Sequence, residues 1–184
     1  TTGRLSAALG VNALGRHTTG IFNVGLGKDA GYGITSGNYN TAVGGLASVG
    51  ALEGTYNTML GYSAGYSLTT GGSNVLIGGL SADSLTTGGL NVAIGVNSLG
   101  VNQTSNRNVA VGYQTLAAQN SDGDIYNTAV GYQAGVSVTS GDKNTLIGGS
   151  AGDSLTTGGK NIALGYEALS TEVAAVGNIA IGHE

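Results

Sequence analysis

The chain has 184 residues, among them 36 glycines but neither proline nor cysteine. This composition excludes collagen, which needs proline and a glycine at every third residue, and it excludes disulfide scaffolds and thiolate metal sites. Charged residues make up 9% of the chain, and the net charge of −4 comes with no basic cluster, so we expect no nucleic-acid partner. No apolar run approaches the roughly 18 residues of a membrane span, and no N-terminal signal-peptide pattern is present, so no membrane insertion is expected.

A repeat of 17 residues runs along the whole chain and decides the fold class. The pentad Asn-Thr-Met-Leu-Gly at 57–61 recurs as Asn-Val-Leu-Ile-Gly at 74–78 and as Asn-Val-Ala-Ile-Gly at 91–95. With this Asn as position 1, eleven copies begin at Ser6, Asn23, Asn40, Asn57, Asn74, Asn91, Asn108, Asn127, Asn144, Asn161 and Asn178. The one longer step gives a 19-residue coil at 108–126, whose two extra residues, around 119–124, are expected in a loop. Residues 1–184 are therefore predicted to form a single repeat domain.

The constrained positions of the repeat favour strands and turns over helices. Position 5 is glycine in all eleven copies, and Thr-Thr-Gly units such as 69–71 are turn signals. Glycine at two fixed positions would cost about 1 kcal/mol each in a helix, whereas the pentads are rich in Thr, Val and Ile, which favour strands. The sequence predicts an all-β parallel β-solenoid of about eleven coils, each with two short strands and two turns.

Two positions are assigned structural roles in the coil. The aliphatic residue at position 4 is predicted to form the core: Leu9, Leu26, Val43, Leu60, Ile77, Ile94, Val111, Val130, Ile147, Leu164 and Ile181. The position-1 amides are predicted to stack as a structural hydrogen-bonded ladder: Asn23, Asn40, Asn57, Asn74, Asn91, Asn108, Asn127, Asn144, Asn161 and Asn178.

Position 3 is also apolar and mostly Ala, although neighbouring side chains of a strand point to opposite faces. Both faces are therefore expected to be covered, and a parallel homotrimer with position 3 at the interface is the simplest closed arrangement. The alternative is a single-chain solenoid that leaves an alanine-rich outer surface.

The pentads at 40–44, 127–131 and 178–182 resemble the Asn/Ser-x-Ala-Ile-Gly head repeats of the YadA-like trimeric autotransporter adhesins. The longer unit, Asn-Thr-Ala-Val-Gly-Tyr-Gln-Ala-Gly followed by a Thr-Thr-Gly turn, resembles repeat arrays in bacteriophage tail fibres. The resemblance implies a left-handed, homotrimeric β-roll. The usual adhesin repeat is shorter than 17 residues, and this sequence contains no trimeric neck, coiled-coil stalk or membrane anchor.

The sequence contains no recognisable set of catalytic residues. The two histidines, His17 and His183, lie near opposite ends of the chain, and the acidic residues share no position of the repeat. The inserted Asp122-Gly123-Asp124 is more consistent with a solvated turn than with a single cation site. We expect no enzyme activity, no catalytic or metal-binding residues and no cofactor.

Tyrosines are the best candidates for surface contacts. Tyr62, Tyr113, Tyr132 and Tyr166 share position 6 and should form a stripe, while Tyr39, Tyr56 and Tyr126 share position 17. Their rings could stack on sugars, but covering turns and glycine-rich edges is the interpretation that we favour.

The expected function is a structural or adhesive fibre segment, a phage tail-fibre shaft or receptor-binding region for host attachment, located in the virion or at a cell surface. Its partners would be two further copies of the chain and a cell-surface glycan or protein receptor. Both ends fall inside a repeat, which suggests a window of a longer rod. A bacterial trimeric adhesin head is the alternative; an ice-binding solenoid that uses the Thr pairs at positions 13 and 14, and a polysaccharide-cleaving tailspike, are weaker ones.

Overall fold

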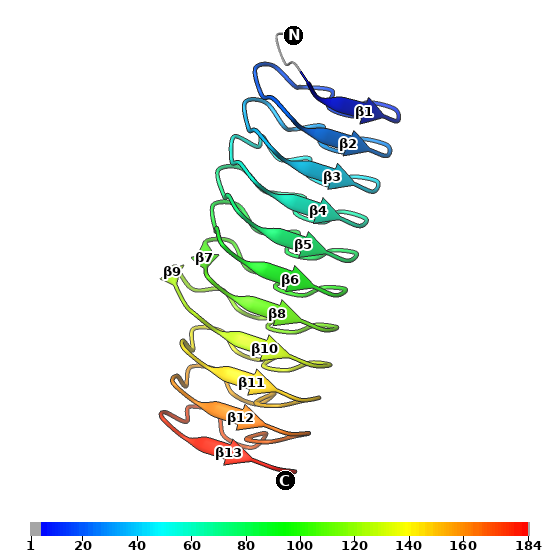
Figure 1. Ribbon diagram of the computed structural model, residues 1–184. Coiled ribbons are helices and arrows are strands. Elements are labelled where there is room, and N and C mark those ends of the chain that lie inside the picture. The colour runs from blue at the N-terminus through cyan, green and yellow to red at the C-terminus, as the bar shows by residue number, and fades with distance from the viewer. Residues whose placement is uncertain (1–4, 184) are drawn as a thin grey trace.

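The computed structural model describes residues 5–183, and these form a rod of stacked coils with the two ends of the chain at opposite ends of the rod (Figure 1). One parallel sheet of eleven strands runs the length of the rod, one strand per coil, in sequential order. Its strands are β1 (Ala7–Leu9), β2 (Val24–Leu26), β3 (Thr41–Val43), β4 (Thr58–Leu60), β5 (Val75–Ile77), β6 (Val92–Ile94), β8 (Val109–Val111), β10 (Thr128–Val130), β11 (Thr145–Ile147), β12 (Ile162–Leu164) and β13 (Ile179–Ile181). No helix is present among these residues, and the predicted β-solenoid is confirmed.

Each coil contains one three-residue strand in this sheet, not two strands as the repeat predicted. The remainder of each coil consists of turns, because residues at positions 7, 9 and 17 adopt left-handed backbone conformations that break a strand. The only other strands in the described chain are β7 (Ser105–Asn106) and β9 (Gly123–Asp124), which pair beside the main stack (Figure 1). The two-residue insertion therefore stays outside the sheet, where β8 and β10 keep the common register, with Val109 opposite Thr128.

Position 3, not position 4, faces the interior of the coil. Ala42, Met59, Leu76 and Ala93 are fully buried, and strand alternation then directs positions 2 and 4 outward. The assignment of position 4 to the core is wrong in this chain: these side chains are partly or largely exposed at Leu9, Leu26, Val43, Leu60, Ile77, Ile94, Val111, Val130, Ile147, Leu164 and Ile181. Because positions 3 and 4 are both apolar, the pattern did not reveal which of them points inward.

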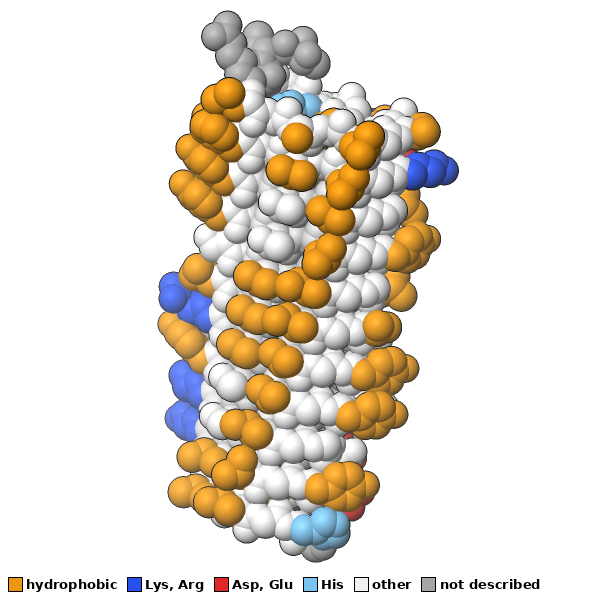
Figure 2. Space-filling view, turned by 45° about the vertical axis from the view of Figure 1, so that its right-hand side comes forward, with side chains coloured by type: hydrophobic (Ala, Val, Ile, Leu, Met, Phe, Trp, Pro, Cys, Tyr) orange, Lys and Arg blue, Asp and Glu red, His pale blue; other side chains and the backbone are white. Residues whose placement is uncertain are grey.

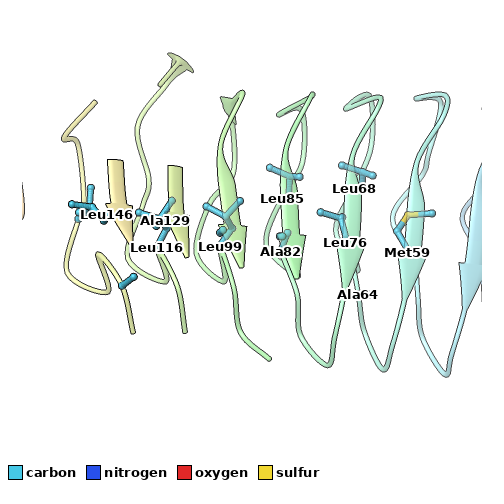
Figure 3. Close-up of a cluster of buried hydrophobic side chains, with 14 of the residues drawn as sticks. Met59, Ala64, Leu68, Leu76, Ala82, Leu85, Leu99, Leu116, Ala129 and Leu146 are labelled. Atoms are coloured by element: carbon cyan, nitrogen blue, oxygen red, sulfur yellow. The ribbon is translucent and has the colours of Figure 1, made fainter. Parts of the chain in front are cut away.

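The interior is filled by positions 3, 8, 9 and 12, and large residues alternate between them (Figure 3). Leu116 at position 9 accompanies Ala110 at position 3, whereas Met59 at position 3 accompanies Gly65 at position 9. A Cβ atom on Gly65 would lie 2.8 Å from Cδ1 of Leu76 in the next coil. No coil holds a large side chain at both positions, as close packing in a fixed cross-section requires.

The predicted asparagine ladder is present inside the rod. Oδ1 of Asn74 accepts hydrogen bonds from the backbone N–H of Asn91 (3.0 Å) and from its Nδ2 (3.3 Å). Nδ2 of Asn74 donates to the carbonyl oxygen of Gly88 and to Oδ1 of Asn57, both at 3.0 Å. The backbone bond to the preceding amide recurs at Asn40, Asn57, Asn74, Asn91, Asn108, Asn127, Asn144, Asn161 and Asn178, and Ser6 supplies the acceptor for Asn23. Each of these amides links its own coil to the next.

Replacement of Asn74 by Ala should lower the free energy of unfolding by about 2–5 kcal/mol, because it leaves a buried N–H of Asn91 and a buried carbonyl of Gly88 without partners. Urea denaturation followed by circular dichroism measures this change. Asn120→Ala is the matched control, since the Asn120 side chain is exposed, and it should change stability by less than about 0.5 kcal/mol. Equal effects of the two substitutions would contradict the ladder's role.

Position 5 is glycine in every coil, and two features of the structure favour it. Its φ values lie between 122° and 140°, a region that other residues rarely adopt. In addition, a Cβ atom on Gly112 would lie 2.2 Å from the carbonyl oxygen of Gly131 in the next coil.

Gly112→Ala should lower the free energy of unfolding by about 3 kcal/mol or more, since it adds both backbone strain and a clash with the next coil. Gly79→Ala is the control, because a Cβ atom there would meet no atom within 4 Å. Thermal unfolding of the two variants beside the parent protein tests this difference, and comparable losses would refute the assignment.

Candidate functional site

The outward side of the main sheet is the most distinctive surface of the rod. We call it the sheet face: the side chains at positions 2 and 4 of every coil, which Figure 2 shows as rows of apolar groups down the rod. Position 4 is aliphatic throughout. Position 2 is β-branched in all coils after the first: Val24, Thr41, Thr58, Val75, Val92, Val109, Thr128, Thr145, Ile162 and Ile179. The sheet face thus carries no charge anywhere along its length.

Two columns of larger side chains border the sheet face, position 17 before the strand and position 6 after it (Figure 2). Tyr62, Tyr113, Tyr132 and Tyr166, predicted to form a stripe at position 6, are all at least 45% exposed. In the position-17 column, Tyr39, Tyr56 and Tyr126 are exposed as well. His183 also belongs to the position-6 column, a placement that the repeat register gives directly but that the sequence reading did not use.

Rings within each column stack on one another along the rod. The centroid distances are 5.2 Å for Phe22 and Tyr39, 5.0 Å for Tyr39 and Tyr56, and 5.4 Å for Tyr113 and Tyr132. Nearly parallel rings at this spacing leave no room for a sugar ring between them. The stacked tyrosines therefore present their edges and hydroxyls outward, which favours a structural role over a row of sugar-binding platforms.

The ionisable groups do not converge on one place. His17 lies in the first coil and His183 in the last, and residues 5–183 contain no cluster of three or more His, Cys, Asp or Glu side chains that could hold a metal ion. The inserted carboxylates are engaged by protein groups: Asp124 lies 3.0 Å from Nε of Arg107, and Asp122 accepts a hydrogen bond from the Thr104 hydroxyl. This pairing favours the solvated turn over a cation site.

One hollow lies at the end of the rod, between residues 168–172 of the tenth coil and 179–183 of the last. The last coil holds only positions 1 to 7 of the repeat, so the hollow lies where its later positions would stack. Its shape follows from the end of the stack and provides no built binding site.

Within residues 5–183, the structure has no helix of the length and apolarity that crossing a membrane would require. Comparison of the chain with known protein families, with curated proteins and with solved structures finds no match.

His17 replaces the aliphatic side chain found at position 12 of several other coils, such as Ile34 and Leu68, and it is 7% exposed. Its Nε2 atom lies 3.1 Å from Nδ2 of Asn23, an amide donor, so this ring nitrogen must act as the acceptor and the ring must be neutral. Burial accordingly lowers the pKa of His17, with an opposing contribution from a hydrogen bond to the backbone of Gly20.

Since the folded pKa of His17 lies below its unfolded value of about 6.5, its stabilising effect should be complete above that pH and decline as the pH falls toward the folded pKa. Amide hydrogen exchange at residues 23–27 should therefore accelerate between pH 7 and pH 5, after correction for intrinsic exchange. His17→Leu, which restores the common side chain of position 12, should remove this dependence. The same pH profile in both proteins would show that other groups cause it.

Proposed function

We propose that this chain is a structural segment of an extracellular fibre, a homotrimeric β-solenoid shaft of the phage tail-fibre type. The observation that carries the proposal is the sheet face, an uncharged and largely apolar strip that continues through eleven coils without interruption. Monomeric soluble proteins rarely expose a contiguous apolar patch of more than about 300–600 Å².

The area of this strip suits self-association. With eleven coils at about 4.8 Å each and a width of about 20 Å, the sheet face and its flanking columns span roughly 1,000 Å² per chain. A stable interface buries about 800 Å² per partner. A straight strip with one repeat spacing fits another copy of itself better than it fits an unrelated partner, and closed cyclic symmetry is the rule for homo-oligomers.

Three copies arranged around an axis parallel to the rod would cover all three sheet faces at once. The resemblance to tail-fibre and trimeric adhesin repeats supports this number. Such a shaft keeps one cross-section along its length, so it spans distance and presents whatever domain follows it. A bacterial adhesin head shares this physics and differs in the domains attached to it.

The structure weakens the ice-binding alternative, because one of its two threonine rows is engaged within the rod. The hydroxyl of Thr69 donates to the carbonyl oxygen of Thr86 (3.0 Å), and that of Thr86 donates to the carbonyl of Gln103 (2.9 Å). Position-13 threonines therefore hold neighbouring coils together and do not form a free hydroxyl array.

Light scattering on the purified chain should give three times the chain mass of 17.9 kDa. Ile94→Lys, in the middle of the sheet face, should weaken assembly tenfold or more while preserving the circular dichroism spectrum, because it buries an unpaired charge at the interface. Thr87→Lys is the control: Thr87 is exposed in a turn away from the sheet face, and the trimer should persist. A monomeric mass for the parent protein would overturn the proposal, and a thermal-hysteresis measurement would then become the next test.

A further inference from the structure

We propose that the position-17 column of one chain packs against the position-6 column of the next chain, with all chains parallel, and that Lys160 reaches the Tyr166–Glu167 pair of its neighbour. This inference rests on the proposed function, because it names the contacts that close the same assembly. It concerns the two borders of the sheet face and not the apolar strip itself.

Within one chain the two columns cannot meet. Six residues of largely extended backbone separate Lys160 from Tyr166, a distance of about 15–20 Å. In the lower part of the rod in Figure 2, Lys and Arg side chains lie along one border of the sheet face and large rings along the other. Any contact between the columns therefore joins two chains.

The two columns are complementary along the rod. The position-17 column has rings at Phe22, Tyr39 and Tyr56 in the first half of the rod. Its second half holds its three cations, Arg107, Lys143 and Lys160, together with Tyr126. The position-6 column has its lysine, Lys28, in the first half of the rod and Tyr113, Tyr132 and Tyr166 in the second half. With parallel chains, the cationic half of one column lies beside the half of the other that is richest in tyrosine.

Two of the three cations in the second half have acidic partners in their own chain. Arg107 lies 3.0 Å from Asp124, and Lys143 lies 2.6 Å from Asp142. Lys160 is exposed and, within residues 5–183, has no ion-pair partner. The border just before strand β12 thus carries an unmatched positive charge.

The opposite border, just after strand β12, carries an unmatched negative charge. The Tyr166 hydroxyl donates a hydrogen bond to the Glu167 carboxylate, which raises the pKa of Tyr166. In the described part of the chain, no Lys, Arg or His forms an ion pair with Glu167. A cation from a neighbouring chain would complete this pair.

Cyclic symmetry determines which residues of neighbouring chains lie at the same level along the rod. Rotation about an axis parallel to the rod involves no shift along it, so each residue faces neighbouring residues of about its own height. Seven of the 17 residues in a coil separate Lys160 from Glu167, which corresponds to a rise of about 2 Å if one coil rises about 4.8 Å. A lysine side chain spans that difference.

Charge exchange tests the contact itself. Lys160→Glu and Glu167→Lys should each weaken assembly about tenfold at low salt, because every interface of the closed ring would place like charges together. The double variant Lys160→Glu with Glu167→Lys should restore assembly to near the parent level. Concentration-dependent light scattering measures all three. Loss without recovery in the double variant would overturn the contact.

Cysteine pairs test the pairing of the columns without dependence on charge, since the chain contains no cysteine of its own. In the double variant Lys160→Cys with Tyr166→Cys, oxidation should link chains into covalent rings of the same number as the measured mass. An intrachain disulfide is excluded, because its Cα atoms must lie within about 7 Å. Each single variant is a control and should form no covalent ring.

The two proposals fail in different ways. A monomeric parent protein would remove the proposed function and this inference together. An oligomeric mass with no covalent ring in the 160/166 variant would remove only the pairing of the columns. Links formed instead in Phe22→Cys with Lys160→Cys would show that the chains run antiparallel, which also overturns the inference.

Discussion

The hydrogen bond from the backbone of each position-1 asparagine to the amide one coil earlier fixes the path that every coil must follow. Because both ends of the bond are buried, each coil must bring the same backbone atom to the same place. The strand register and the close approach at position 5 both follow from this constraint. At the 19-residue coil the bond is 3.2 Å long and the Asn127 amide turns to Oε1 of Gln119 (2.7 Å), while the extra residues are accommodated outside the stack. The asparagine ladder is therefore continuous through this coil, and the loop accommodates the insertion.

Because every coil follows the same path, every coil encloses about the same interior volume. The core side chains of each coil must together fill that volume. Coils with Leu at position 9, as at Leu14, Leu99 and Leu116, have a polar residue at position 12: His17, Asn102 and Gln119 respectively. The amide of Gln119 and the ring of His17 each bond to a ladder asparagine, so these buried polar groups are satisfied where the aliphatic side chain is missing. The residues that fill the core of a coil and the hydrogen bonds of its ladder asparagine therefore vary together.

The sequence was sufficient for the period, the solenoid, the glycine at position 5 and the asparagine ladder, since eleven copies of one coil constrain the same positions repeatedly. It did not show which face of the strand points to the core. Positions 3 and 4 are both apolar, so the alternation of side chains does not tell which of the two is buried. The informative signal was size: Met59 and Leu76 at position 3 are matched by Gly65 and Ala82 at position 9, as a packed interior demands, whereas position 4 is aliphatic in every copy without any such exchange. The sequence also did not predict that each coil has a single strand in the main sheet. The turns depend on left-handed backbone conformations at non-glycine residues such as Tyr39, and residue type does not reveal these.

The inverted orientation strengthens the case for assembly. Had position 4 filled the core, the outer face would have been mostly alanine, a surface that water tolerates. With position 4 outside, every coil adds one aliphatic and, in nearly all coils, one β-branched side chain to a strip that nothing in a single chain covers. Each added coil therefore extends the interior, the ladder and the uncovered strip by the same increment. A protein under selection to remain a monomer would place charges on such a face, as β-proteins do on exposed strands. Here positions 2 and 4 carry no charge in any coil, and the nearest cations lie beside the strip at positions 17 and 6, where they would border the proposed interface without interrupting it.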